Sequence, residues 1–244
     1  MPIGVIVNSL SVVLGGVAGT LLGGRMKASF KDSLNMIFGL CSCGMGIGTI
    51  VLMKNMPVVV FSIIIGTVIG LWLHLGEKVA AMGTWMKNVI QQRLHIRSGS
   101  LSPEEFDAQL LTIIVLFCAS GTAIYGSMVA GMSGDHSILI SKSILDFFTA
   151  MIFACMLGPV VSMIALPQCL IFLVLFALGR FIFPLTTPVM VDDFKAVGGL
   201  LLFATGLRIM NLKMFPVADM IPAMVIAMPV SWAWTAFVAP LIGG

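Results

Sequence analysis

Long apolar stretches alternate with short polar connectors along this chain, and the alternation predicts eight membrane-spanning helices. Most of the stretches approach the roughly 20 residues that an α-helix needs to cross a bilayer. They cover residues 3–24, 34–53, 57–75, 110–132, 138–166, 169–184, 196–210 and 219–242. We therefore expect an all-α integral membrane protein with about eight transmembrane helices, folded as a single transmembrane domain over residues 1–244.

The composition agrees with the membrane class and excludes several others. Hydrophobic residues make up 59% of the chain and charged residues only 9%, whereas a soluble domain is roughly one-quarter charged. The net charge of +3 is spread over the connectors, so it predicts no nucleic-acid partner. The five cysteines lie in apolar stretches, where reduced core residues are expected. No catalytic or metal-binding motif occurs, so we expect no enzyme activity, no metal and no cofactor.

The basic residues predict an orientation in the membrane. With the N-terminus outside, the cytoplasmic connectors would hold Arg25, Lys27, Lys31, Lys78, Lys87, Arg93, Arg97, Arg208 and Lys213. The outer connectors would hold Lys54 and Lys195. An excess of lysine and arginine in cytoplasmic connectors is the usual pattern of membrane proteins. With eight spans, both termini are therefore expected outside.

Residues 76–109 are the longest stretch without a predicted span. Polar and apolar residues mix at helical spacing over 77–97, which predicts an amphipathic helix lying on the membrane. Its apolar stripe would consist of Trp85, Met86, Val89 and Ile90, opposite Lys87 and Gln91. A new helix is expected to begin at Pro103, with Ser102 as its cap and Glu105 three residues further on.

The two ends of the chain share a faint internal repeat. Asp32, Gly39, Leu40 and Gly46 recur at one offset as Asp192, Gly199, Leu200 and Gly206. After a slip of one residue, Lys54, Pro57 and Val58 recur as Lys213, Pro216 and Val217. The repeat pairs spans one to three (repeat A, 3–75) with spans six to eight (repeat B, 167–244), on either side of the central spans 110–166. This 3+2+3 arrangement gives an inverted repeat, which is frequent in secondary transporters.

Lys142 and Asp146 are the candidate site at the centre of the chain. They lie four residues apart in an apolar stretch, so a helix would place them on one face. Charged side chains inside a membrane are costly, and they normally face a protein interior or water. The pair is either a functional site or a structural ion pair, in which Lys142 extends toward the outer interface.

Three small residues, two of them with a hydroxyl group, and one amide extend the candidate site. Ser120, Gly121 and Thr122 lie at mid-depth of the span 110–132, where the helix is expected to be interrupted or closely packed. Interrupted helices of transporters expose backbone groups that bind ions or substrate. Asn8, near the start of the first span, is a candidate neighbour of Asp146 or an interhelical hydrogen-bonding residue. Gly15 and Gly19 form a GxxxG pair that favours close helix packing.

Three long segments, Ile114 to Gly126, Gly131 to Gly158 and Val197 to Phe215, resemble the YqgA-like family of bacterial inner-membrane proteins. The resemblance extends over nearly the whole chain. It implies a bacterial inner-membrane location and an integral multi-span fold. The family is one of unknown function, so the resemblance assigns no site residues.

Two classes of function remain. The first is a small secondary transporter or channel for an ion or a small polar solute, with Asp146 as its responsive carboxylate and Lys142 as counter-charge. The second is a non-transporting scaffold or accessory subunit, in which the pair is structural. The Asp192–Asp193 connector and the helix over 77–97 would then be docking surfaces. The expected partners are the lipid bilayer and a second copy of the chain, since symmetric dimers are the commonest oligomers.

Overall fold

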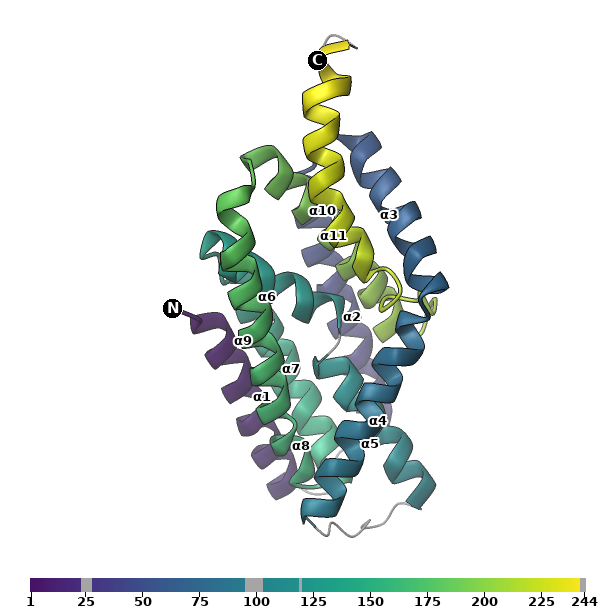
Figure 1. The fold of residues 1–244 in the computed structure, drawn as a ribbon. Coiled ribbons are helices and arrows are strands. Elements are labelled where there is room, and N and C mark those ends of the chain that lie inside the picture. The colour runs from purple at the N-terminus through teal and green to yellow at the C-terminus, as the bar shows by residue number, and fades with distance from the viewer. Residues whose placement is uncertain (23–27, 95–102, 119, 242–244) are drawn as a thin grey trace. The chain divides into compact units, whose positions relative to one another are not determined.

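The computed structural model describes residues 1–22, 28–94, 103–118 and 120–241, and every element in these ranges is helical. The longer helices are α1 (Ile3–Leu22), α2 (Ala28–Ile50), α3 (Met56–Trp72), α4 (Leu75–Leu94), α5 (Pro103–Cys118), α6 (Gly121–Ser133), α7 (Ser137–Leu157), α9 (Ala165–Ile182), α10 (Pro188–Ile209) and α11 (Ile221–Ala233) (Figure 1). The short ones are α8 (Val160–Met163), η2 (Phe183–Leu185), η3 (Trp234–Val238) and η4 (Ala239–Leu241). The predicted all-α class is confirmed for the described residues.

About five or six segments of the described chain are apolar enough to cross a membrane. Five qualify by length and hydropathy, namely 3–22, 109–133, 137–157, 160–185 and 221–241. A sixth results if α3 and α4 are one broken span. The expected count of eight is not confirmed, because the apolar part of α2 covers only Met36–Ile50 and α10 contains four charged residues. The apolar helices make the chain a membrane protein.

Two helices begin earlier than the hydropathy pattern predicts, and both begin around a proline. The span expected over 169–184 runs from 160 to 185, and Pro167 lies in the first turn of α9. The span expected over 196–210 belongs to α10, which begins at Pro188 and is capped by the Thr187 hydroxyl. Proline is tolerated in the first turn of a helix, where its missing N–H has no partner to lose.

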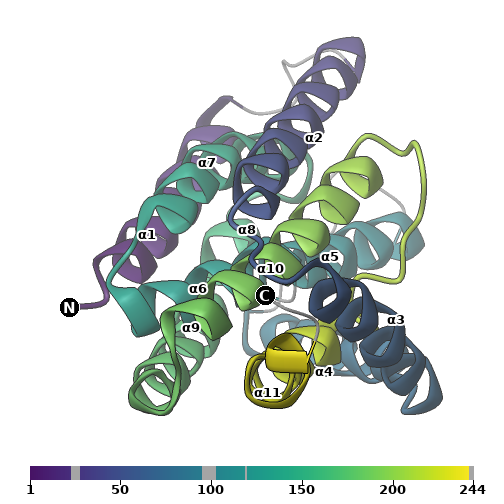
Figure 2. The same ribbon diagram turned by 90° about the horizontal axis from the view of Figure 1, so that it is seen from above.

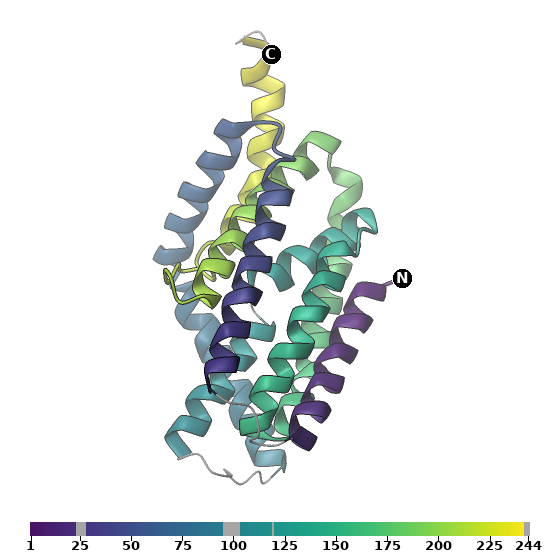
Figure 3. The same cartoon turned by 180° about the vertical axis from the view of Figure 1, so that it is seen from behind.

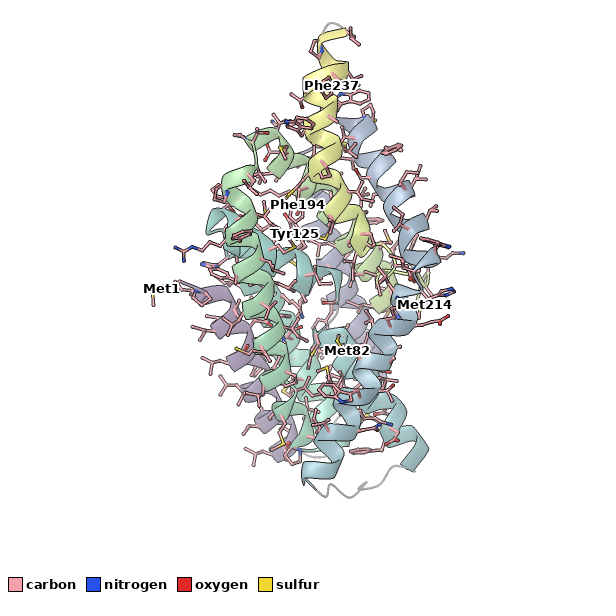
Figure 4. The ribbon with its side chains drawn as sticks, viewed as in Figure 1. Met1, Met82, Tyr125, Phe194, Met214 and Phe237 are labelled. Atoms are coloured by element: carbon pink, nitrogen blue, oxygen red, sulfur yellow. The ribbon has the colours of Figure 1, made fainter. Side chains whose placement is uncertain are left out.

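The chain folds into two compact units, which are described separately. Unit 1 consists of residues 1–37 and 77–181, and unit 2 of residues 38–76 and 182–244. Each unit has its own buried aromatic side chains, including Tyr125 in unit 1 and Phe194 in unit 2. Figure 4 shows both among the helices, whereas Met214 and Phe237 project outward.

In unit 1, α1 and α7 run parallel and in close contact (Figures 2 and 3). Gly15 and Gly19 of α1 pack directly on the backbone carbonyls of Phe147 and Met151 of α7. A Cβ atom at either glycine would overlap the facing oxygen. The predicted GxxxG pair is therefore a helix-packing motif, and the close approach lets short side chains reach across from α1 to α7.

The helix α4 packs against α5, and the four residues of the predicted stripe lie in two different environments. Met86 is buried, and Ile90 packs on the same core. Trp85 and Val89 are exposed. Residues four apart share a helix face and residues one apart do not, so the four residues divide between two faces. The side chain of Gln91 lies outside the described residues, as do Ser102 and the side chain of Glu105, while α5 begins at Pro103 as predicted.

In unit 2, α2 and α10 are antiparallel and meet through glycines in a reciprocal pattern. A Cβ atom on Gly39 would lie 2.6 Å from the Gly206 carbonyl oxygen, and one on Gly206 would lie 2.5 Å from that of Gly39. The corresponding distances between Gly46 and Gly199 are 2.7 and 2.8 Å. Between these contacts the Ser42 hydroxyl donates to the Leu202 carbonyl, at 3.0 Å. The two backbones therefore touch over two helical turns.

The second helix pair of unit 2, α3 and α11, is also antiparallel and close (Figure 1). Gly66 lies against the backbone of Ala223, and Gly70 lies against the backbone of Asp219. The Asp219 carboxylate accepts a hydrogen bond from the Gly76 N–H, at 2.8 Å, and so holds the first turn of α4. Small residues at both helix contacts are typical of membrane helices, where packing replaces hydrophobic burial as the main attraction.

Candidate functional site

The Lys142–Asp146 pair is buried inside unit 1. Lys142 is 3% exposed and Asp146 is 5% exposed. Lys142 Nζ lies 2.7 Å from Asp146 Oδ1 and 2.6 Å from Oδ2, so the ammonium donates to both oxygens. The four-residue spacing on α7 places the two side chains on one face, as predicted. Lys142 does not extend toward an interface in this structure, because its ammonium is enclosed beside the carboxylate.

Asn8 brings α1 into the same cluster. Its Nδ2 donates to Asp146 Oδ2 at 2.9 Å, and the side chain is fully buried. The close approach of α1 and α7 at Gly15 and Gly19 allows this short amide to span the two helices. The expected proximity of Asn8 to Asp146 is therefore observed, in the form of an interhelical hydrogen bond.

Gln168 of α9 completes the cluster, and it is not among the residues predicted from sequence. Its Nε2 donates to Asn8 Oδ1 at 2.6 Å and lies 3.4 Å from Asp146 Oδ2. The network fixes how this amide is oriented, because reversing it would place its oxygen against two acceptors. One signal could have found the residue: it is the only amide side chain in the apolar run 160–185.

The Gln168 Oε1 atom is buried and has no hydrogen-bond partner among the described residues. Leaving a buried acceptor unpaired costs about 1–3 kcal/mol, and native structures rarely accept that cost without a reason. The atom lies on a side chain whose other end already contacts Asn8 and Asp146. A carbonyl oxygen in this position is suited to a donor or a cation.

Two aromatic rings lie near the Lys142 ammonium. Nζ lies 5.7 Å from the ring centroid of Phe117 on α5 and 6.0 Å from that of Phe172 on α9. Both distances are within the range of cation–π attraction. Phe117 is the next-to-last residue of α5, so the C-terminal end of this helix lies near Lys142. The negative end of the α5 dipole thus lies near the cation, which is its favourable position.

The predicted interruption of the span 110–132 occurs between α5 and α6. The helix α5 ends at Cys118, and α6 begins at Gly121 with Ser120 as its cap. The Ser120 hydroxyl accepts from the Ala123 N–H at 3.2 Å, and Thr122 is buried. The break follows closely after Phe117, whose ring lies near Lys142, so it is close to the charged cluster. The Ser120 hydroxyl is already used as the helix cap.

Asp193 in unit 2 is a second buried carboxylate, and it is a structural one. Its Oδ1 accepts from the backbone N–H groups of Lys54 and Asn55, at 3.0 and 2.9 Å. Its Oδ2 accepts from Asn55 Nδ2 at 2.9 Å and from the Ser231 hydroxyl at 2.6 Å. Four donors saturate the carboxylate and hold the turn between α2 and α3. The expectation that Asp193 lies on a docking connector is wrong, because α10 begins before it and buries it completely.

The comparisons with known proteins agree on the family. The model of the family "Protein of unknown function (DUF554)" matches residues 3–232. The chain is 49% identical to the uncharacterized protein YqgA of Escherichia coli, over 98% of this chain and 100% of the relative. It is 24% identical to the uncharacterized membrane protein YdfK of Bacillus subtilis, over 91% and 93% of the two chains. No solved structure matches the chain. The chain therefore belongs to the DUF554 family of proteins of unknown function, as the resemblance to YqgA-like proteins implied.

Proposed function

We propose that this protein is a small secondary transporter or channel for an ion or a small polar solute, and that its site is the cluster of Asn8, Lys142, Asp146 and Gln168. The observation that carries the proposal is the burial of an ion pair and two amides among apolar helices, with one amide oxygen left without a partner among the described residues. Ionisable residues inside membrane helices are expensive, and they typically mark ion or substrate pathways.

The position of the cluster beside a broken helix supports this function. Ser120, Gly121 and Thr122 form the start of α6, where the first backbone N–H groups of the helix lack helical partners. Transporters use such half-helix ends at mid-membrane to bind ions and substrates. We propose these three residues as part of the permeation path next to the cluster.

The proposed architecture is eight spans in an inverted 3+2+3 repeat. The repeat offset pairs Gly39 with Gly199 and Gly46 with Gly206. In unit 2, Gly39 contacts Gly206 and Gly46 contacts Gly199. A two-fold axis between α2 and α10 would give this reciprocity, since in an isologous contact residue i meets j and j meets i. On this proposal α2 and α10 are the two spans that the hydropathy criterion leaves out.

We propose that the protein resides in the bacterial inner membrane with both termini outside. The support is the distribution of lysine and arginine over the connectors, with nine residues on the proposed cytoplasmic side and two on the outer side.

A structural scaffold is the second candidate, and one observation favours it. Asp146 accepts hydrogen bonds from three side chains, so the ion pair is internally satisfied without a ligand. A structural pair and a transport site respond differently to an apolar replacement. Replacing a buried ion pair by apolar residues is often neutral or stabilising, whereas a transport site needs the charges themselves.

The test compares the wild-type protein with Lys142→Met/Asp146→Leu in proteoliposomes on a solid-supported membrane. Concentration jumps of Na⁺, K⁺, ammonium, amino acids and organic acids are applied, and the currents are recorded. The matched control is Lys87→Gln/Asp107→Asn, which removes a partly exposed ion pair of unit 1 with an N–O distance of 2.6 Å. We expect a current in the wild type and the control, and none in the apolar variant, which must show cooperative unfolding well above the assay temperature. No wild-type current for any solute, or an undiminished current in the apolar variant, would contradict the proposal.

A further inference from the structure

The surroundings of the Lys142 ammonium have the chemistry of a cation-binding site. Both Asp146 oxygens lie within 2.7 Å of Nζ. Two phenyl rings, those of Phe117 and Phe172, lie at cation–π distance. In this structure the Lys142 ammonium itself occupies the site.

Two amide oxygens of the same cluster have acceptor capacity that is not used in this structure. Gln168 Oε1 has no partner among the described residues, and Asn8 Oδ1 accepts a hydrogen bond from Gln168. A carbonyl oxygen has two lone pairs, so both amides can accept more than they do here. Carbonyl oxygens can replace the hydration shell of an alkali cation, as they do in potassium channels.

The ligand set favours a weakly hydrated monovalent cation. One carboxylate balances one positive charge, and within the described residues no group of three His, Cys, Asp or Glu is placed to hold a metal ion of higher charge. Aromatic faces attract ammonium groups and substitute poorly for the water around a small, strongly hydrated ion. The Lys142 ammonium fills the space beside Asp146, and an ammonium group is close in size to a dehydrated K⁺.

The lysine side chain is flexible and lies near one end of its helix. Lys142 carries its charge on a flexible four-carbon stem. It lies five residues after Ser137, the first residue of α7, which is about 7.5 Å along the helix axis at 1.5 Å per residue. A lysine this close to a helix end can extend its ammonium toward the interface, as lysines near span ends commonly do.

We infer that the position of Lys142 Nζ is a binding site for a monovalent cation of ammonium or potassium size, held by Asp146, Phe117 and Phe172, for which the Lys142 side chain is a tethered competitor. The inference rests on the proposed function in that it names the substrate class of the same site. When a free cation enters, it would replace the Lys142 ammonium as the charge that neutralises Asp146. Entry of the cation would therefore require movement of the Lys142 side chain.

The experiment is chemical rescue of Lys142→Ala in detergent, with the full chain and thermal unfolding as readout. Chloride salts of ammonium, methylammonium, K⁺, Na⁺, Mg²⁺ and N-methyl-D-glucamine are titrated at constant ionic strength. We expect the variant to unfold at a lower temperature than the wild type. Ammonium, methylammonium and K⁺ should restore this temperature saturably, Na⁺ less so, and Mg²⁺ and N-methyl-D-glucamine not at all. The wild type, whose site is occupied, should respond less than the variant.

Two controls locate the response at the cluster. Lys142→Ala/Asp146→Asn lacks the carboxylate and should lose the rescue. Lys87→Ala leaves Asp107, whose side chain is 44% exposed, without its lysine and should show no saturable response. Rescue that is equal for all cations, that persists without Asp146, or that is as strong in the wild type would overturn the inference. If Lys142→Ala does not fold in the absence of a bound cation, it is purified in ammonium chloride, and the unfolding temperature is measured after exchange into each of the other salts, with the same order of cations required.

The outcomes separate this inference from the proposed function. Cation rescue in detergent without any current from wild-type proteoliposomes would leave the cation site in place and contradict transport. Solute-driven currents without cation rescue would leave transport in place and contradict the cation site.

Discussion

Gly46 of α2 and Gly199 of α10 touch through their backbones. A Cβ atom on Gly46 would lie 2.7 Å from the Gly199 carbonyl oxygen, and one on Gly199 would lie 2.8 Å from that of Gly46. Real Cβ atoms do not approach backbone oxygens so closely, so only glycine allows this helix spacing. The contact determines how near α2 and α10 can come in unit 2.

Alanine at Gly46 should therefore destabilise unit 2, and alanine at the neighbouring Gly44 should not. Gly46→Ala adds a methyl group against the backbone of Gly199 and Phe203, and overpacking of this kind costs about 1–3 kcal/mol. A Cβ atom on Gly44 would have no neighbouring atom within 4 Å, so Gly44→Ala should be neutral or gain up to about 1 kcal/mol from helix propensity. The free energy of unfolding in mixed micelles is measured for both variants. Equal shifts for the two variants would mean that the close contact is absent.

Asn8 and Gln168 should be energetically coupled. Either alanine variant leaves a partner of the cluster without its hydrogen bond, which costs about 1–3 kcal/mol. The double variant should cost less than the sum, because contacting residues typically couple by about 0.5–3 kcal/mol. A double-mutant cycle on the free energy of unfolding gives the coupling. Strict additivity would show that the two amides do not meet.

Asp193 should be far more sensitive than its neighbour Asp192. In Asp193→Asn an amide nitrogen must face two donors whichever way it turns, and the lost charge-assisted hydrogen bonds cost at least about 2 kcal/mol. Asp192 Oδ2 lies 3.9 Å from Lys54 Nζ in a partly exposed pair, so Asp192→Asn should change stability by less than about 1 kcal/mol. The unfolding temperatures of the two variants show whether Asp193 contributes more to stability than Asp192. Similar losses at both positions would argue against the buried role of Asp193.

Asp146→Asn alone should destabilise more than the removal of both charges. The single change leaves the Lys142 ammonium buried without a counter-charge, at a cost of about 3–5 kcal/mol. Lys142→Met/Asp146→Leu removes both charges and should recover most of that loss. The two unfolding free energies are compared with that of the wild type. A double variant as unstable as the single one would show that unpaired charge is not the cause.

The parts of the site that were predictable from sequence are those set by local spacing. Lys142 and Asp146 are four residues apart, and any helix through them brings the side chains together. Gly15 and Gly19 carry the packing motif that draws α1 onto α7 and so places Asn8 beside Asp146. The helix period alone brings Lys142 to Asp146, whereas Asn8 also requires that α1 packs on α7.

Gln168 and the burial of Asp193 were missed because the predicted spans began after these residues. With the span placed at 169–184, Gln168 fell in a connector, yet α9 includes Pro167 in its first turn and carries Gln168 into the interior. With a span placed at 196–210, Asp193 fell in a connector, although Pro188 begins α10. Helix contacts between distant segments have no local signature, so the partners of these side chains required the tertiary structure.

The most direct test of the central claim is the ratio of currents between Lys142→Met/Asp146→Leu and the wild type, in proteoliposomes of equal protein density after a jump of each of the solutes named above. The variant must first show cooperative unfolding well above the assay temperature, so that the ratio reports on the charges and not on loss of the fold. If the buried cluster is the transport site, the wild type carries a current and the ratio is close to zero. A ratio close to one, or no current in the wild type, would contradict the account.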